Sequence, residues 1–175
     1  MDHAIHSLNL EFEKAVRALV LHMPPSDENS RKPALFHAIR VGVYLYEKKY
    51  PRDIVLAGVL HDALEWSEIT EEMIREEFGV SVLKLVRACT KDDSIKDPLE
   101  KINELIKRCA ESGQDALIVK TADVIDSFKY YAGTNNEAEL LYCTRNAAAI
   151  IQYKPESFTD GIFNELRNWQ KGGMQ

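Results

Sequence analysis

The sequence predicts an all-α protein, and three observations carry that prediction. Apolar residues recur with the three-and-four spacing of amphipathic helices along nearly the whole 175-residue chain. Capping residues and prolines mark helix boundaries, and no segment has the alternation typical of a strand. A chain of this length suits one domain with a substantial core, so we expect residues 1–175 to form a single helical bundle of about eight or nine helices.

The chain opens with one predicted helix, one loop and a second helix. Leu10, Ala15, Val16, Leu19 and Val20 form an apolar stripe that predicts a first helix over about 9–22. The stretch from 24 to 32 is rich in Pro, Ser, Asp and Asn, which predicts a loop. Apolar spacing resumes after it and predicts a second helix that carries His37.

The third predicted helix covers about residues 51 to 65. Pro51 fits its first turn, and the residues that follow are apolar on nearly every side. A helix that is apolar all round is usually buried, so we expect this one to be the central helix. His61 and Asp62 fall at its C-terminal end.

The remaining helices are predicted from their caps. Thr70 followed by two glutamates is typical of an N-cap, Gly79 of a helix end, and a further helix should run to about Cys89. Asp97-Pro98 predicts the start of a helix that ends before Gly113. Three more helices are expected over about 114–131, 135–153 and 159–170.

Composition excludes several kinds of partner. Lys plus Arg total 22 and Asp plus Glu 28, giving a net charge of −6, which argues against binding a nucleic acid polymer or an anionic membrane.

No apolar run is long enough to span a bilayer, and the N-terminus does not resemble a signal peptide, so we expect a cytoplasmic protein. The cysteines are widely spaced and are expected to be reduced packing residues.

Four residues on three predicted helices form a candidate metal-ligand set. His37, His61, Asp62 and Asp123 offer two imidazoles and two carboxylates, a mixture suited to Mn²⁺, Fe²⁺, Zn²⁺ or a related ion. Such an ion would lower the pKa of a bound water and polarise a phosphoryl group. Taken singly, Asp123 could instead form a buried salt bridge with Lys120 or be exposed, and His37 could be an ordinary core histidine.

Glu65 is the candidate catalytic residue. It follows His61 by four residues and Asp62 by three, so in a continuous helix the three side chains share one face. Glu65 could then orient or deprotonate an attacking water. On spacing alone, an exposed carboxylate near a helix end is an equal alternative.

The order of the candidate metal ligands, with His37 on one helix, His61-Asp62 on the next and Asp123 on a later one, resembles that of the HD-domain metal phosphohydrolases. Within that group, the spacing over about residues 31–131 resembles the hydrolase domain of RelA/SpoT-type (p)ppGpp enzymes and their small stand-alone relatives. The residues that carry the resemblance are Glu65-Trp66-Ser67, Thr70, Phe78-Gly79, Val82, Leu85-Val86, Thr90-Lys91 and Lys120-Thr121-Ala122-Asp123.

The resemblance implies a metal-dependent hydrolase that removes pyrophosphate from the 3′ side of ppGpp or pppGpp. It implies His37, His61, Asp62 and Asp123 as metal ligands and Glu65 as the catalytic residue. The usual ion of the family is Mn²⁺, with Fe²⁺, Zn²⁺, Ni²⁺, Co²⁺ and Mg²⁺ as alternatives. The expected partner is a small phosphorylated nucleotide, and a homodimer stays open. Candidate substrate-binding residues are Arg31, Lys32, Lys91, Lys120, Trp66 and Ser127.

Three positions depart from the family pattern. Trp66 stands where the family has an Asp, Val124 replaces its customary Arg, and Ser127 replaces its nucleotide-contacting Asn. The metal-ligand set is untouched by these changes, whereas rate and substrate could differ. Two alternatives therefore stay open: a nucleotide phosphatase or pyrophosphatase of the wider superfamily, and a nucleotide-binding regulatory module with weakened catalysis.

Overall fold

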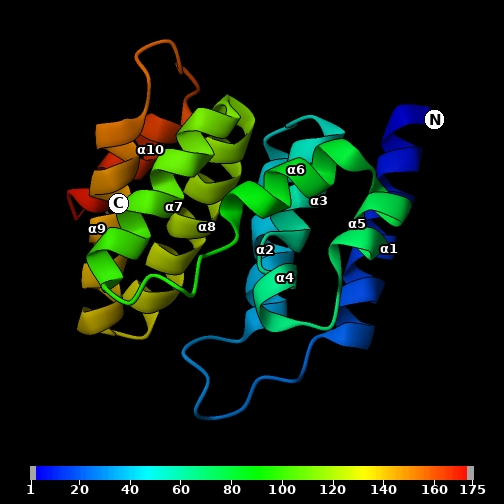
Figure 1. The fold of residues 1–175 in the computed structure, drawn as a ribbon, viewed down its shortest axis with the longest axis horizontal. Helices are drawn as coiled ribbons and strands as arrows, with labels where there is room; N and C mark the ends of the chain where they lie inside the picture. The colour runs from blue at the N-terminus through cyan, green and yellow to red at the C-terminus, as the bar shows by residue number, and fades with distance from the viewer. Residues whose placement is uncertain (1–2, 173–175) are drawn as a thin grey trace. The chain divides into compact units, whose positions relative to one another are not determined.

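The computed structural model describes residues 3–172, and within that range the all-α prediction is confirmed, since no strand is present. Over these described residues the chain forms ten helices, whose arrangement within each unit can be followed in Figure 1. In chain order they are α1 His3–His22, α2 Ala34–Glu47, α3 Arg52–Leu60, α4 Ala63–Trp66, α5 Glu71–Phe78, α6 Val80–Cys89, α7 Pro98–Ser112, α8 Gln114–Gly133, α9 Glu137–Tyr153 and α10 Ile162–Gln170. None of the helices is long and apolar enough to cross a membrane within the range described.

The chain divides into two compact units, Met1–Thr90 and Lys91–Gln175, whose positions relative to one another are not determined. In the first unit, α3 packs against α1, α2 and α6. Every residue of α3 from Ile54 to Leu60 is buried, which confirms the prediction that this segment is the central helix. In the second unit, α9 packs against α7, α8 and α10.

An ion pair between α1 and the first residue of α3 helps to hold these helices together. Arg52 donates through Nε to Glu11 Oε2 at 2.7 Å and through Nη1 to Asp53 Oδ1 at 2.6 Å. The Arg52 hydrogen bond is the main reason that the pKa of Glu11 is lowered from its usual value. Arg52 Nη1 also donates to the Phe78 carbonyl at the end of α5, so one guanidinium joins three helices.

Two glycines allow α2 and α3 to approach closely. A Cβ atom on Gly42 would lie 2.3 Å from Val59 Cγ2, and one on Gly58 would lie 2.4 Å from Leu45 Cδ1. Both separations are shorter than carbon atoms allow, so a side chain at either position would force a neighbouring side chain or helix to shift. Because α2 carries His37 and α3 leads directly into His61, this approach also sets the distance between the two histidines.

The helix predicted over 51–65 is not continuous. It ends at Leu60, and α4 begins at Ala63 after a turn formed by His61 and Asp62. Asp62 has φ −97° and ψ 0°, and its carbonyl accepts from the N–H groups of Glu65 and Trp66. Aspartate favours turns over helix interiors, which accounts for the break. The expectation that Glu65 shares one continuous helical face with His61 and Asp62 was therefore wrong.

The caps confirm most of the other predicted boundaries. Thr70 Oγ1 accepts from the Met73 N–H at 3.3 Å, and Asp97 Oδ1 accepts from the Glu100 N–H at 2.7 Å. The first helix begins at His3 rather than near residue 9, so the prediction missed its opening turns. Cys89, Cys109 and Cys143 form no disulfide and are buried, as expected of packing residues.

Candidate metal site

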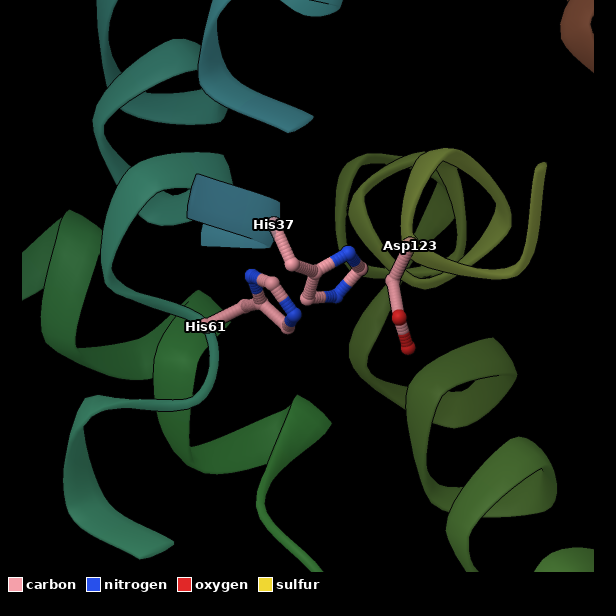
Figure 2. Close-up of side chains that lie close together, drawn as sticks. All are labelled: His37, His61 and Asp123. Carbon is pink, nitrogen blue, oxygen red and sulfur yellow. The ribbon is translucent and has the colours of Figure 1, made fainter. Parts of the chain in front are cut away.

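The first unit brings two histidines together at the ends of two packed helices. His37 lies in the first turns of α2, and His61 directly follows α3. Their rings meet edge to face, with centroids 5.1 Å apart and an interplanar angle of 81° (Figure 2). A ring nitrogen of one lies within 4.8 Å of a ring nitrogen of the other. His37 is fully buried and His61 is 2% exposed, so neither ring is a surface group.

Hydrogen bonds fix which nitrogen each ring presents. His61 Nδ1 lies 2.8 Å from the Gly58 carbonyl, and because a carbonyl only accepts, Nδ1 donates. His37 Nε2 lies 2.8 Å from Lys32 Nζ, and because an ammonium only donates, that Nε2 accepts. In the neutral rings, the lone pair is therefore on Nε2 of both histidines. A backbone carbonyl that orients a metal-binding histidine is a recurrent support in metal sites.

Asp62 brings a carboxylate to the same two nitrogens. Its Oδ2 lies 3.4 Å from His61 Nε2 and 4.0 Å from His37 Nε2. Bonds of about 2.0–2.2 Å to a divalent ion place two of its ligands about 3 to 4.4 Å apart, depending on the angle between them. The three residues therefore form a His/Asp cluster whose donor atoms and spacing fit such an ion.

Asp123, the fourth predicted ligand, lies on α8 in the second unit, and its side chain is drawn in Figure 2. Lys120, one turn earlier, donates to Asp123 Oδ2 at 2.7 Å, and Ser127, one turn later, donates to Oδ1 at a long 3.4 Å. All three side chains are nearly buried. The salt bridge considered as an alternative for Asp123 is thus present, and it occupies one of the two carboxylate oxygens.

The other predicted site residues lie in the following places. Arg31 and Lys32 end the loop before α2, where Arg31 is exposed and Lys32 half-buried. Glu65 is half-buried on α4, and the neighbouring Trp66 is 55% exposed. Lys91 is half-buried at the start of the second unit. These six positions, Arg31, Lys32, Glu65, Trp66, Lys91 and Lys120, thus differ widely in exposure, from the open Arg31 to the buried Lys120.

Sequence reasoning missed two features near the predicted ligands. Asp126 lies one turn after Asp123 on α8 and is only 7% exposed, so α8 carries a second buried acid. Its spacing of three from Asp123 within an apolar helix was the available signal. The carbonyl of Gly58, which orients His61, left no mark in the sequence, because any residue supplies a carbonyl.

The chain belongs to the HD-domain family. The HD domain model matches residues 15–144, a range that crosses the boundary between the two units. Proteins of this family depend on divalent metal ions, and the cluster of His37, His61 and Asp62 could hold one. The resemblance noted from the sequence is thereby confirmed at the level of the family.

Relatives with named activities also match a part of the chain. A guanosine-3′,5′-bis(diphosphate) 3′-pyrophosphohydrolase of Aquifex aeolicus (strain VF5) is 32% identical over 123 residues, which cover 67% of this chain and 18% of that protein. The enzyme of the same name called MESH1 in Drosophila melanogaster is 30% identical over 99 residues, 55% of each chain. The chain therefore corresponds to a fraction of these relatives, about a fifth of the first and about half of the second.

A solved structure has the same fold. It belongs to a protein described as "a metazoan ortholog of SpoT" that "hydrolyzes ppGpp and plays a role in starvation responses". The TM-score is 0.73 at 18% sequence identity, and the match covers 93% of this chain and 94% of the other. At that identity, the match supports the helical fold of the HD domain and carries no residue assignment.

Proposed function

We propose that this chain is a divalent-metal-dependent phosphohydrolase that releases pyrophosphate from the 3′ position of (p)ppGpp. The observation that carries the proposal is the cluster of His37, His61 and Asp62, with both Nε2 lone pairs fixed by hydrogen bonds in a chain of the HD-domain family. The substrate class follows from the named activity of the Aquifex and Drosophila relatives. We infer that residues 1–175 act as one such domain.

His37, His61 and Asp62 would hold the ion, with Asp123 as the fourth ligand. When bound, the ion would supply charge stabilisation for a phosphoryl group and make water a better nucleophile. Mn²⁺ is the proposed ion because the resemblance to the (p)ppGpp hydrolases implies it, and the mixed imidazole and carboxylate donors are compatible with it. We propose Oδ1 of Asp123 for this role, because Lys120 donates to Oδ2 at 2.7 Å whereas Ser127 reaches Oδ1 only at 3.4 Å.

Glu65 would act on the attacking water. It lies on the one-turn helix α4, whose first hydrogen bonds are accepted by the Asp62 carbonyl. The turn at His61 and Asp62 thus ties the position of Glu65 to that of a proposed ligand. A carboxylate there would accept a proton from water as the bond from the water oxygen to the 3′ phosphorus forms and the bond from that phosphorus to the ribose 3′ oxygen breaks. The 3′ oxygen would take up a proton, which gives GDP or GTP, and the pyrophosphate released would carry the water oxygen.

Positive charge for the phosphates would come from Arg31, Lys32 and Lys91. The chain as a whole has a charge of −6, so a polyanion would need such local cations. Lys120 is less suited to this role than the sequence implied, because it is buried and paired with Asp123. We propose that Lys120 supports Asp123 instead.

Trp66 and Ser127 are the positions at which substrate preference would differ from that of the relatives. The Trp66 side chain is 55% exposed, so its ring is available to stack on a base or ribose. Ser127 is turned towards Asp123, at 3.4 Å. The hydroxyl of Ser127 is shorter than the asparagine amide of the family pattern, so it would make a weaker contact with a nucleotide.

A substrate panel tests the proposal. The panel holds ppGpp, pppGpp, GTP, GDP and deoxynucleoside monophosphates, each assayed for phosphate and pyrophosphate with Mn²⁺ and with chelator. We expect metal-dependent pyrophosphate from ppGpp and pppGpp alone. Release from another member would transfer the chain to a nucleotide phosphatase or pyrophosphatase activity, and metal binding without turnover on any member would favour a regulatory module.

The proposed location is the cytoplasm, where a free nucleotide substrate would be present. The proposed partner is that nucleotide, with no nucleic acid polymer and no membrane. A homodimer is the alternative to a monomer, and sedimentation of the whole chain would distinguish the two.

A further inference from the structure

The loop before α2 places a lysine on the imidazole of His37. Lys32 Nζ donates to His37 Nε2 at 2.8 Å, and the two residues are five positions apart. The backbone N–H of His37 donates to the Pro33 carbonyl, and this hydrogen bond closes the first turn of α2. The Lys32 side chain is half-buried and the His37 ring is fully buried, so this hydrogen bond is largely shielded from water.

The same nitrogen cannot serve Lys32 and a metal ion together. A neutral imidazole has one lone pair in the plane of the ring, on the nitrogen that carries no proton. That lone pair either accepts a hydrogen bond or coordinates a cation. Nε2 is also the His37 atom that lies 4.0 Å from Asp62 Oδ2, on the side where His61 Nε2 and this carboxylate converge. Coordination by the cluster therefore requires Lys32 to leave.

We propose that Lys32 is a resident cation of this site, which competes with the metal ion for His37 Nε2 and is released when the ion binds. The proposal rests on the metal site of the proposed function. Lys32 is bonded to His37 Nε2, which lies 4.0 Å from Asp62 Oδ2, so its charge partly offsets that of the half-buried carboxylate while no ion is bound. When the divalent ion binds, it offsets the charge of Asp62 in place of Lys32. The ion and the ammonium group would repel each other at one lone pair, so Lys32 leaves.

Release of Lys32 would order the binding of metal and nucleotide. The freed ammonium stays tethered five residues from His37, so it remains close to the site and can pair with a phosphate oxygen. While it is bonded to His37, it is not available to the substrate. Positive charge for the nucleotide thus becomes available only after the metal ion is in place.

Metal affinity measures the competition. Mn²⁺ is titrated calorimetrically into the wild type, Lys32→Met and Arg31→Gln, after circular dichroism has shown that all three are folded. Losing a competitor whose hydrogen bond is worth about 1 kcal/mol should tighten binding in Lys32→Met by at least about fivefold. Arg31→Gln removes the same charge one residue away without removing the bond to His37, so its affinity should change by less than about twofold.

An unchanged or weaker affinity in Lys32→Met overturns the proposal. So does an equal gain in Arg31→Gln, which would indicate a general charge effect. If the wild type and both variants bind no metal, the metal site of the proposed function fails, and this inference fails with it. If the wild type binds Mn²⁺ and hydrolyses its substrate while Lys32→Met binds no more tightly, only the competition is refuted.

Amine reactivity gives a second measurement on the wild type. Acetylation of individual lysines is followed by mass spectrometry with chelator and with saturating Mn²⁺. Lys32 should react faster when the metal is bound, whereas Lys84, exposed on α6, should react at the same rate in both conditions. A Lys32 rate that is unchanged or lowered by Mn²⁺ contradicts its release.

Discussion

The buried ion pair of Lys120 and Asp123 makes a strong prediction about stability. The Nζ–Oδ2 distance is 2.7 Å, and the two side chains are only 6% and 10% exposed. Removing one member leaves the other charge in a poorly hydrated place, which costs about 3–5 kcal/mol in comparable pairs. We therefore expect Asp123→Ala to lower the free energy of unfolding by about 3 kcal/mol or more. Lys120→Met should lower it by a similar amount.

The double variant isolates the interaction. In Lys120→Met/Asp123→Ala neither charge is left behind, so its loss of stability should be smaller than the sum of the single losses by about 2 kcal/mol or more. The assay is urea unfolding followed by circular dichroism, with chelator present so that no bound ion contributes. Glu13→Gln breaks an exposed pair with Arg17, whose side chains are 74% and 58% exposed, and should cost less than about 0.5 kcal/mol.

Additive effects, or single losses below about 1 kcal/mol, would refute this reasoning about the pair. The result also decides how the metal site is tested. Asp123→Ala alone would lose metal affinity through unfolding as well as through loss of a ligand. The double variant removes the carboxylate from a folded chain, so its metal affinity reports on the ligand itself.

Three further predictions concern catalysis, packing and acid stability. Glu65→Gln should bind Mn²⁺ with unchanged affinity in calorimetry yet lose at least about a hundredfold in turnover, and equal turnover would exclude a proton-transfer role. Gly42→Ala should lower the free energy of unfolding in urea by about 1–3 kcal/mol, because its Cβ would lie 2.3 Å from a valine methyl of α3. The same change should weaken Mn²⁺ binding. Gly133→Ala is the control, because a Cβ at Gly133 meets open space. Arg52 lowers the pKa of Glu11, so their ion pair should stabilise the fold fully above the ordinary pKa of a glutamate. That stabilisation should be lost as the pH falls through the lowered pKa of Glu11. The stability of Glu11→Gln should therefore depend less on pH in the acid range, and an acid unfolding profile like that of the wild type would contradict this.

The fold was largely predictable because helices carry a local signal. The apolar face of α3 and the caps at Thr70 and Asp97 are each set by a few neighbouring residues. The turn at His61 and Asp62 was missed because apolar spacing continues through it, and a pattern of side chains does not report the backbone angles of one residue. The close approach at Gly42 was also missed, since it depends on which helix packs against α2.

The candidate site was predictable in its residue types and less so in its contacts. His37, His61 and Asp62 were selected by order and chemistry, and the first unit brings all three together. The bond from Lys32 to His37 was not foreseen, because the conformation of the loop before α2 decides which group a lysine reaches. Lys120, predicted to contact the substrate, is buried and paired with Asp123, which is the alternative that the sequence also offered for this aspartate.

The most direct test of the central claim is the metal dependence of ppGpp cleavage by the whole chain. The protein is stripped with chelator, assayed, reloaded with Mn²⁺ and assayed again, with nucleotide and pyrophosphate products quantified together. We predict no turnover in the stripped protein and, after reloading, GDP and pyrophosphate in equal amounts. Turnover that persists in the stripped protein, or release of phosphate in place of pyrophosphate, would contradict the account.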